Sequence, residues 1–512
     1  MIYTDIKKQY RKKKIMLALV VSTLCLLAGC QGKTQEEVWA TVESEQAGAE
    51  SMEREDASPD VDMEIISEED ATFDGNLEIE ADSQNAEKEM DQEAKSDSDK
   101  SAPVKVKGIY VSGPVAGIER MDELIALVDE TELNAMVIDI KNDEGRVTYK
   151  MQSETVVEIE AGIRYIPDME ALVQKCKEKD IYLIARIVAF KDPYLAEKCP
   201  ELAVKTKAGA VFKDKSGLAW VNPYKKEVWD YLIEVSKEAA KVGFDEIQFD
   251  YIRFSTDLKS DELDFGPEAE NKSKTEIISE FTRYACEALA DMDVYVSADV
   301  YGTIIDNKVD QKIVGQDYVE MASYLDYICP MVYPSHYGNG VYGIEIPDAE
   351  PYRTVNTAMN AAAAELSVLP KEERAINRVW IQSFTATWVN GHITYGPEQI
   401  REQIRGAYDA GYDEWILWNA SVKYQRDSLL TDEEAEAEQK GWELEKQEAE
   451  RLAEEAAKQE AEKLEAEEAA KQEAESLEAE EAARQEAESL EAKEAAKQDT
   501  ERLAEETKAT AE

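Results

Sequence analysis

Histidine is scarce in this chain of 512 residues: only His336 and His392 are present, and they are 56 positions apart. Zinc sites need several Cys, His, Asp or Glu ligands at characteristic spacings, so we expect no metal and no other cofactor. No G-x-S-x-G motif is present, which argues against a Ser-His-Asp hydrolase of the nucleophile-elbow type. The chain also lacks a Gly-rich phosphate loop after its first strand-like segment, as a dinucleotide-binding fold would require.

A surplus of positive charge is missing as well, because the formal net charge is −53. Proteins that bind nucleic acid need a basic face for the phosphates, so nucleic acid is excluded as a partner. The same charge would be repelled by anionic membrane surfaces. Any attachment to a membrane must therefore come from an anchor rather than from the protein surface.

The first thirty residues contain a basic run from Arg11 to Lys14 and an apolar run from Ile15 to Leu27. This order is typical of a secretory signal, and the apolar run is short for a membrane-spanning helix. The residues Leu27-Ala28-Gly29-Cys30 resemble the bacterial lipobox. That resemblance implies that residues 1–29 are removed and that Cys30 receives acyl chains such as palmitate. The mature protein would then be anchored on the extracytoplasmic face of the cell membrane. An ordinary signal peptide with a chance cysteine is the alternative.

Two further segments are too polar to form a packed core. Residues 30–104 are rich in acids, Ser and Gln and poor in aromatics, which predicts a disordered acidic tether. Residues 429–512 contain charged repeats with a period of thirteen, built from good helix formers. A leucine repeated every thirteen residues turns about 140° around a helix at each step, so it makes no heptad seam. We expect a long solvated helix, with coiled-coil self-association as the alternative.

Short apolar runs alternate with amphipathic segments in the middle region, residues 105–428. Continuous apolar strands joined by helices indicate a parallel sheet covered on both faces. Eight such units predict an α/β fold of the (β/α)8 TIM-barrel type, and an open doubly wound sheet is the competing arrangement. The expected strands span residues 107–113, 135–141, 181–187, 246–252, 293–300, 327–334, 378–384 and 414–420.

Asp250 and Asp299 stand near the ends of two neighbouring predicted strands. Side chains alternate along a strand, so Asp250 shares a face with Gln248, whereas Ile247 and Phe249 lie on the opposite face. In a TIM barrel the chemistry takes place at the carboxyl ends of the strands. The sequence therefore places both aspartates at the mouth of the barrel.

Glycoside hydrolysis needs such a pair of carboxyl groups, one as acid and one as nucleophile or base. Adjacent strands lie about 4.8 Å apart, so Asp250 and Asp299 are the predicted catalytic residues. Neighbouring strand ends favour a close pair and retention of anomeric configuration. The alternative is a buried ion pair of Asp250 with Arg186 or Arg253.

Other polar and aromatic residues at the strand ends and their loops are candidates for substrate binding. They are Asp139, Lys141, Arg186, Gln248, Tyr251, Arg253, Tyr301, Tyr333, His336, Gln382, Trp418 and Asn419. Four cysteines lie outside the predicted signal peptide and lipobox. We interpret them as buried free thiols, although an exported protein can form disulfides. These cysteines are Cys176, Cys199, Cys286 and Cys329.

Several of these motifs occur in the order found in a known family: GFDEIQFDYIRF, SADVYG, PMVYPSHY, WIQSFTA and WILWNAS. Over residues 105–425 the chain resembles the putative glycosyl hydrolase domain family of bacterial surface proteins, a barrel distantly related to the alpha-amylase type. By similarity to amylase-type barrels, Asp250 would be the nucleophile and Asp299 the acid/base. The amylases have Glu at the second position and an acid where this chain has Gln382. A chitinase-type site is not matched, because Gln248 and Ile252 stand where that pattern requires acids.

These observations lead to one expected function and one alternative. The first is a lipid-anchored extracytoplasmic glycoside hydrolase that cleaves a polysaccharide or cell-wall glycan. The alternative is a non-catalytic glycan-binding barrel in the cell envelope. Activity with and without Asp250 on a panel of glycans separates them.

Overall fold

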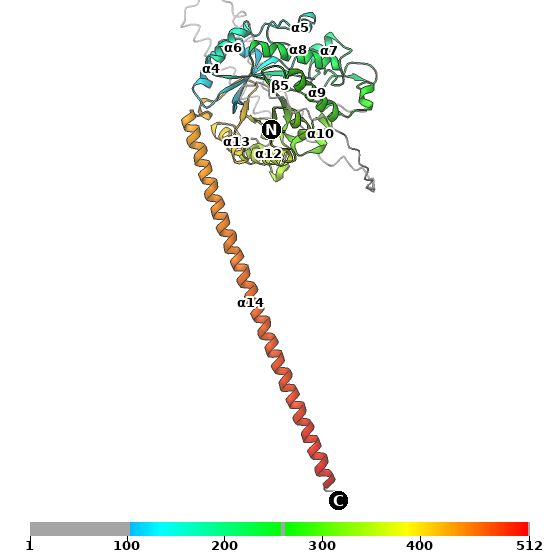
Figure 1. Cartoon of the computed structure of the whole chain (residues 1–512), viewed down its shortest axis with the longest axis vertical. Coiled ribbons are helices and arrows are strands. Elements are labelled where there is room, and N and C mark those ends of the chain that lie inside the picture. The colour runs from blue at the N-terminus through cyan, green and yellow to red at the C-terminus, as the bar shows by residue number, and fades with distance from the viewer. Residues whose placement is uncertain (1–102, 258–261, 510–512) are drawn as a thin grey trace, which may run out of the picture. The chain divides into compact units, whose positions relative to one another are not determined.

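The computed structural model describes residues 103–257 and 262–509, and the predicted signal peptide, lipobox and tether up to residue 102 lie outside them. Within the described residues the chain forms two compact units that divide after Thr431. The first unit contains every strand of the described residues, and the second consists of one helix (Figure 1).

Eight parallel strands form a closed barrel in the first unit. The strands in barrel order are β1 (Lys107–Val111), β2 (Ala135–Lys141), β3 (Tyr182–Val188), β5 (Glu246–Asp250), β7 (Tyr295–Tyr301), β8 (Tyr327–Val332), β10 (Val379–Gln382) and β11 (Trp415–Trp418). Pairing of β8 with β10 and of β11 with β1 closes the sheet. The predicted TIM barrel is confirmed, and the open doubly wound sheet is wrong.

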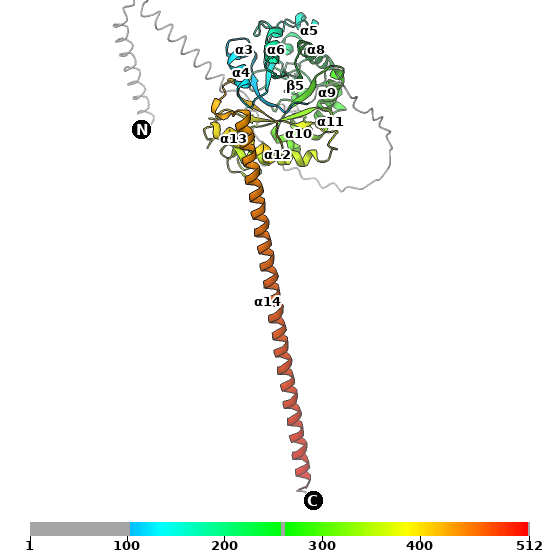
Figure 2. The ribbon, with the colours of Figure 1, turned by 60° about the vertical axis from the view of Figure 1, so that its left-hand side comes forward.

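Helices surround the barrel on its outer side (Figures 1 and 2). They are α3 (Gly113–Ala116), α4 (Arg120–Asp129), α5 (Glu154–Glu158), α6 (Met169–Lys177), α7 (Pro193–Lys198), α8 (Lys226–Val242), α9 (Lys274–Leu289), α10 (Lys308–Val314), α11 (Tyr318–Tyr324), α12 (Pro351–Leu366) and α13 (Pro397–Asp409). Short 3-10 turns and two-residue strands fill the loops: β4 (Lys205–Thr206) pairs with β6 (Leu263–Asp264), and β9 (Ile376–Asn377) pairs with β8.

Local sequence signals set the helix ends. Ser273 accepts a hydrogen bond from the backbone of Glu276, and the Glu276 side chain accepts one from the Ser273 backbone, so a capping box starts α9. Helix α8 ends at Gly243, whose φ of 114° lies in the left-handed region that glycine adopts without a Cβ clash. The strands between these helices are apolar because both of their faces are covered; β2, β3 and β7 are buried along their whole lengths.

The predicted faces of β5 are confirmed. Phe249 lies on the outer face, where its ring packs edge-on against Phe281 of α9 at 5.5 Å. Gln248 points inward and reaches the Sγ atom of Cys329 on β8 at 3.5 Å. Asp250 is two residues after Gln248 on β5, so its side chain also points inward, at the mouth of the barrel.

A charged layer lies lower in the barrel. Arg378 follows β9 and forms ion pairs of 2.9 Å with Glu246 on β5 and with Glu414, which precedes β11. All three side chains are buried. The predicted strand at 378–384 is accordingly observed as β9 and β10, with Arg378 between them.

Within the described barrel, Cys176, Cys199, Cys286 and Cys329 form no disulfide. Cys176 and Cys329 are buried, whereas Cys199 and Cys286 are only half-buried. Burial raises the pKa of the Cys176 thiol to about 12, which keeps it protonated and unreactive.

The second unit is helix α14 (Asp432–Ala509), a helix of 78 residues. Its leucines at 464, 477, 490 and 503 are each about 60% exposed, as a solvated helix requires. In the sequence a Glu stands four residues before a base at each repeat boundary, which favours the pairs Glu454–Lys458, Glu467–Lys471 and Glu480–Arg484. The structure instead pairs Lys463 with Glu467 and Arg484 with Glu488. These side chains are exposed and long, so a base can reach an acid on either side at little cost. Among the described residues, none of the helices combines the length and apolar character of a membrane span.

Candidate active site

Asp250 and Asp299 lie beside each other at the mouth of the barrel. Strand β5 pairs with β7 in parallel, and the register matches Phe249 with Ala298, so the two aspartates come next in line. Both line one small pocket at the mouth of the barrel. The other residues that line this pocket are Asp143, Arg186, Tyr251, Met331, Tyr333, Trp380 and Trp418.

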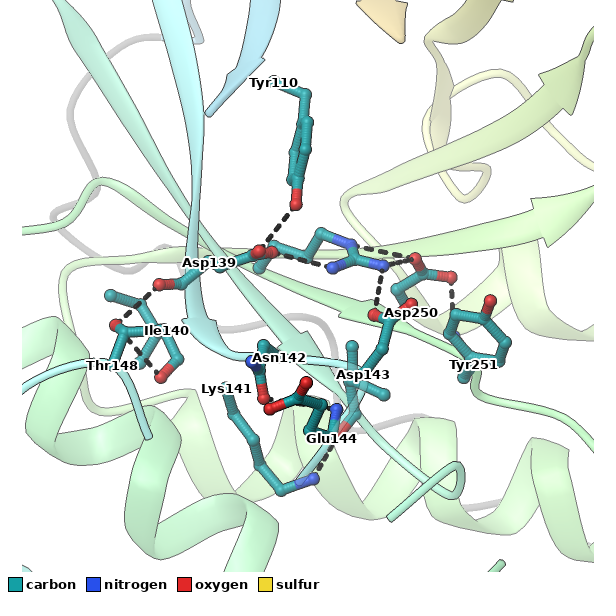
Figure 3. A network of polar contacts seen from close by, with 12 residues as sticks. Tyr110, Asp139, Ile140, Lys141, Asn142, Asp143, Glu144, Thr148, Asp250 and Tyr251 are labelled. Atoms are coloured by element: carbon teal, nitrogen blue, oxygen red, sulfur yellow. Dashed lines mark hydrogen bonds and ion pairs between the residues drawn. The ribbon is translucent and has the colours of Figure 1, made fainter. Parts of the chain in front are cut away.

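Arg186 on β3 lies between three carboxylates. Its guanidinium is 2.7 Å from Asp139, 3.0 Å from Asp143 and 2.5 Å from Asp250. Figure 3 shows these three aspartates converging from β2, from the loop after it and from β5. Tyr110 adds a hydrogen bond of 2.6 Å to Asp139. The ion pair of Asp250 with Arg186, left open by the sequence, is therefore present.

The two oxygens of Asp250 are held differently. Oδ2 accepts hydrogen bonds from Nε and Nη2 of Arg186, at 2.9 and 2.5 Å. Oδ1 accepts one, at 2.6 Å, from the backbone N–H of Tyr251. Burial raises the pKa of Asp250, and the adjacent Arg186 cation opposes that increase. Multiple charge-assisted hydrogen bonds fix this carboxylate in one orientation.

Tyr251, the next residue, has a left-handed backbone with φ of 48°. This conformation is costly for a residue with a large side chain and persists only where the surroundings enforce it. Lys191 donates a hydrogen bond of 3.0 Å to the Tyr251 hydroxyl, and Trp220 packs edge-on against the ring at 5.9 Å. The strained turn directs the N–H of Tyr251 to Asp250 and places Tyr251 in the lining of the pocket.

Asp299 has a less polar environment than Asp250. Oδ1 accepts a hydrogen bond of 2.6 Å from Nε1 of Trp380, and Oδ2 has no hydrogen-bond partner among the described residues. Burial, reinforced by the negative charge of Asp250, raises the pKa of Asp299 well above its usual range. The arrangement thus separates the two carboxyls: Asp299 favours the protonated form, and Asp250 retains a cation beside it.

The structure brings six of the predicted site residues to the pocket, and the other eight described ones lie elsewhere. The six are Arg186, Asp250, Tyr251, Asp299, Tyr333 and Trp418. The eight are Asp139, Lys141, Gln248, Arg253, Tyr301, His336, Gln382 and Asn419. Cys30, the predicted lipidation site, lies outside the described residues.

Several of those eight residues make buried contacts with other parts of the barrel. Lys141 is fully buried in an ion pair of 2.8 Å with Asp192, because a bulge in β2 places it outside the inward-facing row. Arg253 is buried with its guanidinium 4.3 Å from the ring centre of Tyr301. Asn419 donates to the carbonyl of Ser383 at 2.6 Å and so joins the ends of β10 and β11.

Asp143, Trp380 and Met331 line the pocket but are not among the predicted site residues. Asp143 follows β2 in the motif IDIKNDEG, and a run of acids after a strand end was an available signal. Trp380 stands two residues before Gln382 on β10, so both side chains lie on the same inward face. Within the described residues no three His, Cys, Asp or Glu side chains are grouped to hold a metal ion.

Comparison with protein families matches residues 108–424 to the family described as "Putative glycosyl hydrolase domain". The chain belongs to this family. This match confirms the family and the glycosyl hydrolase class that the motifs indicated. The matched residues coincide with the barrel.

Solved structures similar to this glycosyl hydrolase family member include three from different bacteria. A hypothetical protein from Ruminiclostridium thermocellum ATCC 27405 is 42% identical, covers 38% of this chain and 97% of its own, and has a TM-score of 0.35. The PgaB (BpsB) glycoside hydrolase domain from Bordetella bronchiseptica is 13% identical, with coverages of 62% and 95% and a TM-score of 0.47. The alpha-galactosidase TtGalA from Thermus thermophilus is 14% identical, with coverages of 67% and 63% and a TM-score of 0.40. Comparison with curated proteins finds no match.

Proposed function

We propose that the barrel hydrolyses a polysaccharide with Asp299 as general acid and Asp250 as nucleophile or base. The observation that carries this proposal is the unequal environment of two neighbouring carboxyls in one pocket. Glycosidases require one carboxyl that stays protonated and one that is ionised. Asp299 fits the role of the acid because burial and the negative charge of Asp250 raise its pKa, and they outweigh the opposing hydrogen bond from Trp380. Asp250 fits the role of the ionised group because Arg186 stabilises charge on it.

Atoms in the pocket suit these roles. Among the described residues, Oδ1 of Asp250 accepts one hydrogen bond, so it keeps a lone pair for attack on an anomeric carbon or on water. Oδ2 of Asp299 carries the proton that passes to the leaving oxygen, since Oδ1 is occupied by Trp380. The positions on adjacent strands favour retention. Tyr333 and Trp418 supply flat apolar surfaces with polar edges, which match the faces of sugar rings.

A specific observation favours a second candidate, the non-catalytic glycan-binding barrel. Arg186 makes two hydrogen bonds to Asp250, as it would if Asp250 served only to balance a buried cation. Arg186 also pairs with Asp139, which does not line the pocket. Asp139 therefore provides a matched control for the loss of one carboxylate beside Arg186.

The decisive experiment compares Asp250→Asn with Asp139→Asn on a panel of cell-wall and environmental polysaccharides. We expect Asp250→Asn to lower turnover by at least about a thousandfold, a loss of about 4 kcal/mol in barrier lowering, with fold and glycan binding retained. Asp139→Asn should lower turnover far less. Equal losses in both variants, or near-normal hydrolysis by Asp250→Asn, would establish Asp250 as a structural ion-pair partner.

We also propose that the enzyme works outside the cytoplasm while held on the cell membrane by acyl chains at Cys30. The support is the order of basic run, apolar run and lipobox-like residues at the N-terminus. Acyl chains contribute about 0.8 kcal/mol per buried methylene, and several chains together give stable anchoring. A glycan of the cell envelope or surroundings would then be the accessible substrate.

A further inference from the structure

Four aromatic rings lead outward from the candidate active site. His336 and Phe384 lie side by side, 6.4 Å apart, and each contacts Tyr333 on the inner side and Trp388 on the outer side. Tyr333 lines the pocket, and His336 follows it in the loop after β8. Phe384 and Trp388 lie in the loop after β10. The ring centres are 5.2 Å apart for Tyr333 and His336, 6.2 Å for Tyr333 and Phe384, 6.5 Å for His336 and Trp388, and 5.9 Å for Phe384 and Trp388. We call these four residues the aromatic row.

Exposure increases outward along the aromatic row. Tyr333 is buried at 4% exposure, His336 and Phe384 are half-buried, and Trp388 is 50% exposed. The rings of Phe384 and Trp388 are stacked, with 23° between their planes. A tryptophan that is half exposed leaves apolar surface in water, and a ligand that covers this surface gains the free energy of its burial. Because the row begins inside the pocket, a ligand that fills the pocket and continues outward is the occupant that fits.

Gln382 holds the two loops that carry the aromatic row. Its Oε1 accepts the backbone N–H of Ser335 at 3.1 Å, and its Nε2 donates to Asp348 and to the carbonyl of Phe384, each at 3.1 Å. Asp348 in turn accepts the N–H of Ile393 in the same loop as Trp388. The buried amide of Gln382 therefore joins both loops. Such preorganisation lowers the ordering cost of binding.

We propose that the aromatic row is a second sugar-binding subsite that takes a neighbouring unit of the same glycan chain. Aromatic rings with polar edges stack on the apolar C–H faces of sugars, and a row continuous with the pocket contacts consecutive units. The preferred substrate is then an oligosaccharide or polymer rather than a short glycoside. Gln382 is a positioning residue for this subsite. The inference rests on the proposed function for its chemistry, but binding tests it independently of hydrolysis.

The binding experiment uses full-length Asp250→Asn protein, which blocks turnover, with and without Trp388→Ala. The probes are glucose-based α-1,4 and β-1,4 oligomers and β-1,4-linked N-acetylglucosamine oligomers, from monosaccharides to hexasaccharides. We expect affinity to rise with chain length, and Trp388→Ala to weaken hexasaccharide binding by at least about tenfold while leaving monosaccharide binding unchanged. Trp388→Phe should restore most of the affinity, since it restores a flat ring.

Tyr352→Ala provides a matched control, because Tyr352 is a partly exposed aromatic residue on the outer helix α12. It should leave all affinities unchanged. Absence of binding to every oligomer, length-independent binding, or equal loss of monosaccharide and hexasaccharide binding in Trp388→Ala would overturn the subsite. Length-dependent binding through Trp388 without hydrolysis by the native chain would support the subsite and refute the proposed hydrolase.

If the native chain hydrolyses the oligomers, Trp388→Ala alone, with Asp250 intact, can be tested by its kinetics. Trp388→Ala should raise KM for long substrates by about tenfold and leave kcat unchanged, because the row contacts a unit away from the reacting bond. Hydrolysis of a short aryl glycoside should be unaffected. A fall in kcat on both substrate lengths would contradict the proposal and indicate a disrupted pocket.

Discussion

Asp250 and Asp299 have the same side chain, yet the barrel gives the two carboxyls different electrostatic surroundings. Asp250 lies against the guanidinium of Arg186, and Asp299 lies against the indole N–H of Trp380. Desolvation penalises a charged carboxyl, and a neighbouring negative charge adds to that penalty. One cation placed nearer to Asp250 is therefore enough to separate the roles of two adjacent acids.

This separation predicts how stability depends on pH in Asp299→Asn. The pKa of Asp299 in the folded state lies well above its ordinary value of 3.8. Between 3.8 and that folded-state pKa, the unfolded chain releases its proton while the folded chain retains it, so wild-type stability falls as pH rises. We expect Asp299→Asn to be more stable than wild type near neutral pH, by about 1.4 kcal/mol for each tenfold difference in proton affinity between the folded and unfolded states.

Denaturant unfolding across an acid-to-neutral pH series measures this difference. The advantage of Asp299→Asn should vanish below about pH 4, where the carboxyl is protonated in both states. A stability difference that stays constant across the series would mean that Asp299 titrates normally in the folded protein.

At the scale of elements, the strands of the barrel are joined by more than backbone hydrogen bonds. Arg378 connects Glu246 on β5 with Glu414 beside β11, across the barrel interior. The Nη2 atom of Arg378 has no hydrogen-bond partner among the described residues. Buried charges are costly unless paired, so this arrangement depends on every member being present.

We predict that Arg378→Met destabilises the protein by about 3–5 kcal/mol, because two buried carboxylates lose their cation. Arg120→Met removes an exposed ion pair with Glu123 and should change stability by less than about 1 kcal/mol. Thermal and denaturant unfolding of both variants measure the difference. A small effect for Arg378→Met would show that water or proton uptake replaces the guanidinium.

Helix α14 is the element whose stability is most local. Arg451 pairs with Glu448 and with Glu455 along the helix, and the four repeat leucines are exposed. Pairs at these spacings stabilise an isolated helix by about 0.2–0.5 kcal/mol each. Because the leucines form no seam, self-association would bury little apolar surface.

We therefore predict that a peptide of residues 432–509 is helical and monomeric. Its circular dichroism should be independent of peptide concentration, and salt should lower its helicity by screening the ion pairs. Helicity that rises with concentration would favour the coiled coil, and helicity near zero at every concentration would show that the helix needs the rest of the chain.

At the scale of the whole molecule, negative charge is spread over both the barrel and the C-terminal helix, whereas the candidate chemistry lies in the barrel alone. The barrel holds the candidate site, whereas the repeats of α14 are charged along their full length and exposed. A net charge of −53 keeps such a chain soluble and repels anionic surfaces. Attachment to a membrane would then depend on Cys30, which lies outside the described residues.

Fractionation of cells that express Cys30→Ser tests this attachment. We expect the variant to be lost from the membrane fraction, because it lacks the thiol that acyl transfer requires, while it stays folded and active. Radiolabelled palmitate should enter the native chain and not the variant. Full retention of Cys30→Ser in the membrane fraction would exclude lipid anchoring at this residue.

The sequence by itself determined the barrel and the inward direction of residues on a regular strand such as β5. Alternation along β5 places Gln248 and Asp250 on one face, and this follows from backbone geometry alone. The spacing of apolar runs and helices, together with capping signals such as Ser273 and Glu276, is equally local. Those features are encoded in neighbouring residues, so they can be predicted before any tertiary contact is known.

Only the tertiary structure decided which side chains meet. Arg186 lies among Asp139, Asp143 and Asp250, Trp380 reaches Asp299, and Lys141 turns away to Asp192. These partners come from different strands and loops, so their contacts depend on strand register, on the bulge in β2 and on the space left by neighbouring side chains. The sequence pattern of one strand does not indicate which residues of another strand its side chains will contact. For that reason the two aspartates could be named from the sequence, with Arg186 and Arg253 as alternative partners of Asp250. The choice of Arg186 and the contact of Trp380 with Asp299 required the tertiary structure.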